Sequence, residues 1–131
     1  MKTIILMLLM MVAIPARAQA PEVLKQVPNT NIYIRTDQLL RLPQGFRAFI
    51  VTNLPARDIV GYPQSMVTEI EGKCGDRVFH VAGQWVYAGK LGEGSILASG
   101  PWEGEQFERK VTPGSPFERA FNMLCEVDHA K

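Results

Sequence analysis

The chain has 131 residues, of which 14 are lysine or arginine and 13 are aspartate or glutamate, so its formal net charge is +1. This length suits one domain. Because charges of both signs are interspersed, the chain has no basic stripe of the kind that nucleic-acid binding requires, and we expect no nucleic-acid partner.

Residues 1–18 are typical of a secretory signal peptide. Lys2 gives the positive start, and residues 3–14 form an apolar run that is shorter than the roughly 20 residues needed to span a bilayer. Small residues follow, and we expect cleavage after Ala18, because cleavage after Ala20 would put Pro21 directly behind the cut. The alternative is a retained N-terminal anchor helix, which the short apolar run disfavours.

The mature chain is expected to be periplasmic or secreted, without stable insertion in a membrane. Its only cysteines, Cys74 and Cys125, lie far from the cleavage region, so no lipid anchor is expected there. Two cysteines in an exported chain predict one disulfide. With His80 and His129 they match no zinc-ligand spacing, and we expect neither a metal nor a cofactor.

The first half of the mature chain contains two predicted strands and a long loop. Residues 19–30 contain two prolines and are expected to form an extended lead-in. Residues 32–36 and 46–53 are predicted strands because of their β-branched and aromatic content, and residues 42–45 break the chain between them. Residues 54–64 are predicted to be a loop, and loops of this length are often functional.

Short strands then recur every eight to ten residues, joined by turns that contain glycine. We predict strands at residues 65–74, 77–81, 84–90 and 95–100, with a turn at Ala82-Gly83. Residues 106–111 form either a last strand or an extended arm. Such a meander predicts an antiparallel sheet.

Residues 65–74 alternate between two faces of that sheet. The more charged face carries Val67, Glu69, Glu71 and Lys73. The other face carries Met66, Thr68, Ile70, Gly72 and Cys74. The charged face is predicted to be solvated, and the less charged face is where a disulfide-linked helix should pack.

The clearest helix start lies near the C-terminus. Ser115 can accept a hydrogen bond from the first turn, and Pro116 suits the first helical position. Glu118 can reach back to the Ser115 amide, which would complete a capping box. The apolar face of the helix is predicted to consist of Phe117, Ala120, Phe121, Leu124 and Cys125.

The sequence thus predicts an α+β fold: a single antiparallel β-sheet of about five or six strands, arranged as a meander, with a C-terminal helix packed on one face and one disulfide. The predicted core consists of Met66, Ile70, Ile96, one of Trp85 and Val86, and the helix phenylalanines. The alternation does not decide which face of the strand with Trp85 and Tyr87 is buried, because its other residues are small.

No catalytic motif stands out, and we predict no catalytic residues. Glu69 and Glu71 face the same way, and either of them with His80 would be the residues of a small periplasmic enzyme. The simpler interpretation is a solvated face on which Lys73 balances the charge. Aromatic side chains anchor interfaces, although they fill cores more often. The candidate binding-surface residues are Tyr62, Tyr87 and Trp102.

Several of these features together resemble the surface-adhesin protein E-like family. They are the strand ending in Cys74, the strand with Tyr87, the isolated Trp102, and the T-P-G-S-P-F-E segment (residues 112–118) that leads into the helix with Cys125. The resemblance implies an exported bacterial domain in which a disulfide joins an antiparallel sheet to a C-terminal helix. Family members with a known role are outer-membrane adhesins that bind host matrix and plasma proteins and can dimerise.

Two features depart from that family. The chain lacks the anchoring cysteine of the lipoprotein adhesin, and residues 101–110, where a basic ligand-binding stretch would lie, contain three glutamates. We therefore predict an exported non-enzymatic domain, residues 31–128, that binds a host or envelope protein through its sheet face or an edge strand and can form homodimers. The alternatives are a periplasmic accessory of an envelope machine and the small enzyme considered above.

Overall fold

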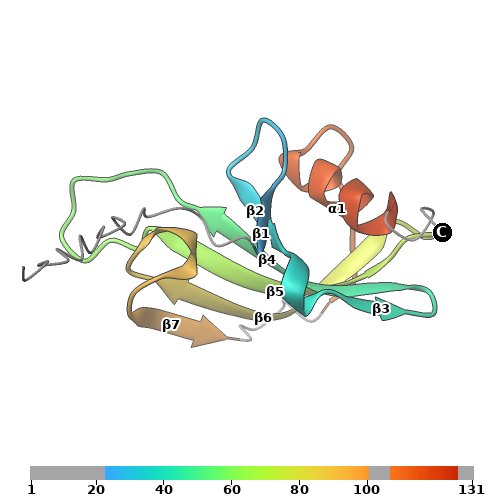
Figure 1. Ribbon diagram of the computed structural model, residues 1–131, viewed down its shortest axis with the longest axis horizontal. Coiled ribbons are helices and arrows are strands. Elements are labelled where there is room, and N and C mark those ends of the chain that lie inside the picture. Colours follow the sequence, from blue (N-terminus) through green and yellow to red (C-terminus); the bar gives the residue numbers. More distant parts are fainter. Residues whose placement is uncertain (1–22, 101–106, 127–131) are drawn as a thin grey trace, which may run out of the picture.

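The computed structural model describes residues 23–100 and 107–126. Within them, one antiparallel sheet carries α1 (Pro116–Glu126) across one of its faces (Figure 1). The strands are β1 (Leu24–Gln26), β2 (Ile32–Arg35), β3 (Leu40–Leu42), β4 (Gly45–Asn53), β5 (Ser65–Lys73), β6 (Val78–Tyr87), β7 (Ile96–Gly100) and β8 (Arg109–Lys110). Two single-turn 3₁₀ helices, η1 (Thr36–Gln38) and η2 (Lys90–Gly92), interrupt the connections.

The sheet order is β1-β2-β4-β5-β6-β7, with β3 paired to β4 and β8 paired to β6. The predicted fold class is confirmed, with eight strands rather than five or six in the described residues. The unpredicted strands are β1 and β3, each of three residues, which is too short for alternation to be recognised. The two-residue β8 lies within residues 106–111, for which a last strand was one of the two predictions. The segment expected to be a lead-in supplies β1, which pairs with β2.

The predicted turn at Ala82-Gly83 is wrong, because β6 is one continuous strand. Glu69 pairs with Gly83 and its neighbour Ile70 pairs with Val81, so Ala82 is an extra residue in β6. This is a β-bulge, which an isolated glycine in a strand often marks. The ladder continues past the glycine because the nine-residue β5 offers an unbroken partner on both sides of the bulge.

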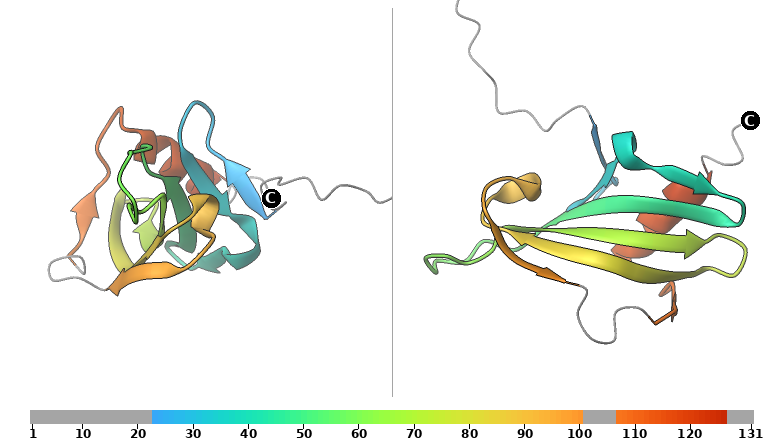
Figure 2. Two further views of the ribbon diagram at one scale, coloured as in Figure 1. Left: turned by 90° about the vertical axis from the view of Figure 1, so that its left-hand side faces the viewer. Right: turned by 90° about the horizontal axis from the view of Figure 1, so that it is seen from below.

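The core lies between α1 and the sheet, and the right-hand view of Figure 2 shows α1 behind the strands. Phe121 is fully buried and its ring meets that of Phe46 edge-on, with 5.5 Å between ring centroids. Phe117 packs against the edge of this cluster. The buried cluster comprises Val27, Ile32, Ile34, Phe46, Ala48, Ile50, Ile70, Val81, Val111, Ala120, Phe121 and Leu124.

The predicted core is confirmed for Ile70 and the helix phenylalanines, and it is wrong for the residues at the other end of the sheet. Met66, Trp85 and Val86 are only partly buried, and Ile96 is 56% exposed. An eleven-residue helix is about 16 Å long, whereas a nine-residue strand spans about 30 Å. The helix is therefore too short to cover the whole sheet.

The predicted disulfide is confirmed: Cys74 at the end of β5 is bonded to Cys125 in the last turn of α1. Their Cα atoms are 5.7 Å apart. The cross-link and the Phe46–Phe121 contact fix the helix at the same end of the sheet.

The capping box forms with one changed partner. The Ser115 Oγ accepts a hydrogen bond from the Glu118 amide at 3.2 Å, as predicted. The Glu118 carboxylate accepts from the amide of Gly114 at 3.1 Å rather than from that of Ser115. The Ser115 amide instead donates to the carbonyl oxygen of Thr112, which explains the change.

Candidate functional site

The side of β4, β5 and β6 opposite α1 is the first candidate surface, here called the open face. Residues paired across antiparallel strands point to the same side of a sheet, so the strand register defines this face. Its side chains include Arg47, Phe49, Glu69, Glu71, Lys73, His80 and Trp85. The right-hand view of Figure 2 looks onto it.

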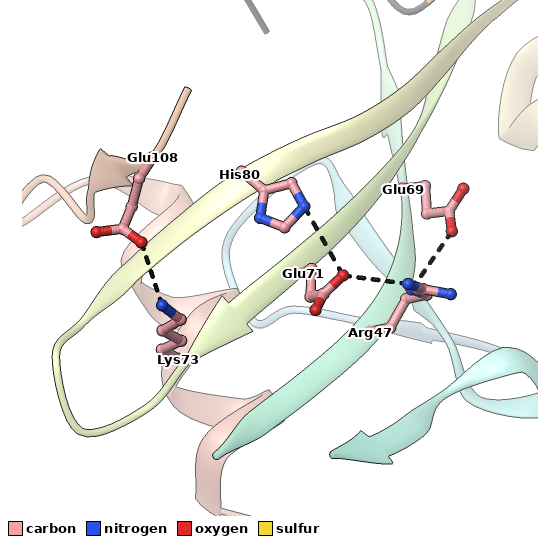
Figure 3. Close-up of polar contacts among 6 residues, drawn as sticks. All are labelled: Arg47, Glu69, Glu71, Lys73, His80 and Glu108. Atoms are coloured by element: carbon pink, nitrogen blue, oxygen red, sulfur yellow. Dashed lines mark hydrogen bonds and ion pairs between the residues drawn. The ribbon is translucent and has the colours of Figure 1, made fainter. Parts of the chain in front are cut away.

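A charged network occupies the end of the open face near the β3–β4 hairpin (Figure 3). The Arg47 guanidinium donates to Glu71 at 3.2 Å and lies 3.8 Å from a carboxylate oxygen of Glu69. His80 Nε2 lies 3.7 Å from the same oxygen of Glu71. These side chains are 21–45% exposed, which makes this a solvated ion-pair network.

The solvated face is as predicted, but the expectation that Lys73 balances Glu69 and Glu71 is wrong. Lys73 extends to Glu108, with 3.4 Å between Nζ and Oε2. The balancing cation is Arg47, which comes from the neighbouring strand. The periodicity of one strand contains no information about the residue that its neighbour places opposite.

A cleft of about 430 Å³ lies beside this network. It is lined by Leu42, Pro43, Gln44, Gly45, Glu71, Gly72, Lys73, Val78, Phe79, His80 and Glu108. Glu71 and His80 both line the cleft, whereas Glu69 does not. The structure therefore brings Glu71 and His80 to one cleft, which is one of the two carboxylate and histidine combinations considered for an enzyme, and it places Glu69 against Arg47.

An aromatic pair lies next to the charged network on the same face. The rings of Phe49 and Trp85 are 5.9 Å apart, at an angle of 37°, and they meet across β5. Trp85 lies over Gly83, because a Cβ at position 83 would be 3.0 Å from Cη2 of the indole. Both aromatic side chains are partly exposed. The structure thus settles which way Trp85 points: toward the open face and away from α1.

The connection from β6 to β7 folds over the other end of the open face. The Ser65 hydroxyl, fully buried, donates to the Gly89 carbonyl at 2.6 Å and accepts from the Gly92 amide at 2.9 Å. The Asn53 side chain accepts from the Leu91 amide at 2.9 Å. Tyr87, a predicted binding residue, is half-buried at this end and lines a cavity of about 180 Å³ with Leu91 and Gly92 among its neighbours.

The loop of residues 54–64, here called the projecting loop, is the second candidate surface and extends beyond the sheet in Figure 1. Ile59 is 59% exposed and Val60 is fully exposed. The Tyr62 amide donates a hydrogen bond to the Ile59 carbonyl at 3.1 Å. The Arg57 guanidinium lies 5.5 Å from the centre of the Tyr62 ring. Tyr62 and Tyr87 line different cavities, and the third predicted residue, Trp102, lies outside the described residues.

Among residues 23–100 and 107–126, no group of three or more histidine, cysteine, aspartate or glutamate side chains could hold a metal ion. The same part of the chain contains no helix long and apolar enough to cross a membrane. Within these residues, the candidate surfaces are the open face, the cleft beside it and the projecting loop.

Fold, disulfide and surfaces define a small α+β domain of the disulfide-closed, exported kind. The chain belongs to the surface-adhesin protein E family, whose sequence profile matches residues 22–126. The family is one of exported adhesins, which generally act by binding rather than by catalysis. No match to a curated protein sequence was found.

Solved structures of Haemophilus influenzae protein E share the fold. Crystal form II of that protein has a TM-score of 0.69 and 18% identity, and the match covers 88% of this chain and 95% of that one. A second structure has a TM-score of 0.68 and 17% identity, covering 85% and 89%. Protein E from non-typeable Haemophilus influenzae has a TM-score of 0.65 and 17% identity, covering 87% and 83%. At these identities the likeness concerns the fold alone.

Proposed function

We propose that this chain is an exported, non-enzymatic domain that binds a host matrix or plasma protein, and that the projecting loop is its main contact. The observation that carries the proposal is the exposure of Ile59 and Val60, at 59% and 105%. Neighbouring apolar side chains that are exposed together at the tip of a loop are typical of an interaction site. Family membership supports a protein as the partner.

The projecting loop is held at both ends, which favours binding. The Leu54 amide donates to the Gln64 carbonyl at 2.8 Å, and the Gln64 amide donates to the Tyr87 carbonyl at 3.0 Å. Arg57 lies over the Tyr62 ring within the loop itself. A loop that is ordered before binding loses less conformational entropy when the partner arrives. Tyr62, Tyr87 and Trp102 remain the predicted aromatic contacts.

An enzymatic function has less support. Glu69 lies outside the cleft that Glu71 and His80 line. Glu71 and His80 are 31% and 38% exposed and 3.7 Å apart, beyond hydrogen-bonding distance. A catalytic acid or base is normally held in a water-excluding site by partners that orient it. This pair lines a cleft, but both side chains are about one-third exposed to solvent.

Direct binding tests the proposal. The chain without residues 1–18 would be immobilised under non-reducing conditions and exposed to a panel of purified matrix and plasma proteins. Replacing both Ile59 and Val60 with serine should lower the affinity for the protein that binds by roughly tenfold or more, which is the usual loss when an interface anchor is removed. Leu97→Ser is the matched control, because Leu97 is 46% exposed on β7, away from the loop. Equal binding by the two variants would contradict the role of the loop.

The location of the protein tests the host-facing part of the proposal. Cells would be fractionated, and the mature chain followed by blotting in the periplasm, the outer membrane and the medium. Presence in the outer membrane or the medium is expected. Confinement to the periplasm would rule out direct contact with a host protein and would favour an accessory role in the cell envelope.

A further inference from the structure

We propose that the open face binds a lysine or arginine side chain of a protein partner, which lies against Trp85 and pairs with Glu69. The inference rests on the proposed function, because it names the chemistry that a protein partner must present to this face. It concerns a different surface from the projecting loop. It is carried by the placement of one aromatic ring and one carboxylate.

Trp85 has the geometry of a platform. Gly83 has no side chain, and the indole occupies the space that a Cβ at that position would fill, 3.0 Å from Cη2. The ring therefore lies along the strand instead of extending away from it. Because Trp85 is only partly buried, part of its ring surface is accessible to a ligand. A cation over the face of a tryptophan is attracted by the quadrupole of the ring.

Phe49 extends the platform across β5. Its ring meets that of Trp85 at 37° with 5.9 Å between centroids, so the two rings form one aromatic surface. Glu69 lies in the row between them, since it pairs with Phe49 on one side and with Gly83 on the other. The aliphatic stem of a lysine or arginine could pack on the rings while its head group reached the carboxylate.

Glu69 has unused capacity to accept hydrogen bonds. Its contact with Arg47 is 3.8 Å long, whereas Arg47 donates to Glu71 at 3.2 Å. Among the described residues, no donor is within hydrogen-bonding distance of the Glu69 carboxylate, although its side chain is only 21% exposed. An ionised carboxylate can accept from several donors, and a guanidinium or ammonium group supplies them.

Of the carboxylates in the network of Figure 3, Glu69 has the weakest partner. Glu71 pairs with Arg47 at 3.2 Å and Glu108 pairs with Lys73 at 3.4 Å, whereas the contact of Glu69 with Arg47 is 3.8 Å long. Trp85 lies partly exposed on a sheet face, which suits a cation presented on a protruding segment of a protein partner better than an enclosed small molecule. Arginine suits the site better than lysine, because its planar head group also stacks on aromatic faces.

The test uses two synthetic glycine- and serine-rich peptides that differ at one position. One contains arginine and the other contains citrulline, which has a similar shape but no charge. Binding would be followed by NMR through the indole N–H signal of Trp85, assigned with Trp85→Phe. The arginine peptide should shift this signal at millimolar concentration, and raising the salt concentration should weaken the effect. The citrulline peptide should leave it unchanged.

Three variants separate the two parts of the site. Because Trp85→Leu and Trp85→Phe lack the indole signal, binding to these two variants is followed through the backbone amide signals of Glu69 and Gly83. Trp85→Leu should bind the arginine peptide roughly tenfold more weakly, and Trp85→Phe should lose less affinity, because phenylalanine keeps a ring. Glu69→Gln keeps the shape of the side chain and removes its charge, so it should weaken binding by roughly fivefold. Glu108→Gln is the matched control, because Glu108 is a nearby carboxylate that pairs with Lys73. Melting curves would verify that each variant folds.

The outcomes distinguish this inference from the proposed function. No shift of the Trp85 signal, or an equal shift with the citrulline peptide, would overturn the cation site. The cation site would also be overturned if a host protein bound to Trp85→Leu and Glu69→Gln as tightly as to the unchanged protein. In that case the proposed function would still stand. If the arginine peptide binds as expected while no matrix or plasma protein does, the cation site stands and the host partner is wrong.

Discussion

Gly72 of β5 lies directly against Phe121 of α1. A Cβ at position 72 would be 2.9 Å from Cε2 of Phe121 and 2.5 Å from Cζ of Phe46. Both phenylalanines are fully buried. The glycine therefore sets how closely the helix approaches the sheet, next to the disulfide that fixes the same end.

Replacing Gly72 with alanine should lower the free energy of unfolding by about 1–3 kcal/mol, the usual cost of overpacking a core. The two rings cannot move away easily, because each packs against the other. Urea denaturation followed by circular dichroism would measure the change. Gly75→Ala is the matched control, because a Cβ there would meet nothing within 4 Å. If Gly72→Ala and Gly75→Ala had the same free energy of unfolding, the close contact of α1 with the sheet at Gly72 would be refuted.

The sequence was sufficient for the parts of the fold that depend on local pattern. Ser115 and Pro116 locate the start of the helix, and Cys125 follows from the spacing of its apolar face. The alternation in β5 places Cys74 on the helix side. Each of these inferences needs only residues that are close together in the chain. The short outer strands form only because they pair with residues that are distant in the chain, and a segment of two or three residues contains no pattern that predicts such pairing.

The open face could be predicted only in part, for a reason that lies in the bulge at Ala82. Regular alternation from His80 would put residue 84 on the open face and Trp85 on the other side. The extra residue reverses the alternation, so that Gly83 and Trp85 join His80 on one face. A bulge is a property of two paired strands. The sequence of β6 alone therefore could not reveal that Trp85 lies beside Glu69.

Removing the disulfide should have the largest effect on stability. Cys74 and Cys125 are 51 residues apart, and in the chain-entropy model a loop of that length contributes about 4 kcal/mol. This is a large share of the stability of a small domain. Cys125→Ser should lower the melting temperature markedly, and so should treatment of the unchanged protein with a reductant.

The variant in which both cysteines are replaced by serine controls for reactions of the remaining thiol. It should melt close to Cys125→Ser in the absence of oxidant. An unchanged melting temperature in either variant would show that the cross-link does not stabilise the domain.

Loss of the helix cap should have a smaller effect. The Ser115 Oγ accepts from the Glu118 amide at 3.2 Å and donates to the Thr112 carbonyl at 2.7 Å. Ser115→Ala should cost about 1 kcal/mol of unfolding free energy. Ser115→Asp should cost less, because it keeps an acceptor and its negative charge is favourable at a helix N-terminus. Chemical denaturation of both variants measures the difference, and the reverse order would contradict the capping role.

Ser65 should control the segment that folds over the open face. Its buried hydroxyl links Gly89 and Gly92, and Leu91 between them has a φ of 57°, an unfavourable backbone conformation for leucine. In Ser65→Ala the Gly92 amide and the Gly89 carbonyl lose the hydroxyl as a partner, and because both hydrogen bonds are only partly buried the loss should cost about 1 kcal/mol. The turn around Leu91 should then loosen, because only the Asn53 side chain and the backbone hydrogen bonds of Gly89 and Glu93 would still hold it.

Amide hydrogen exchange measures this local effect. The Gly92 amide should exchange faster in Ser65→Ala, while the amides of β4 should change only as far as global stability does. Ser99→Ala is the control, because Ser99 is exposed on β7. If the Gly92 amide exchanged at the same rate in both variants, the hydroxyl would not hold the turn. If it exchanged faster only in Ser65→Ala, the Ser65 hydroxyl holds the turn that lies over this end of the open face.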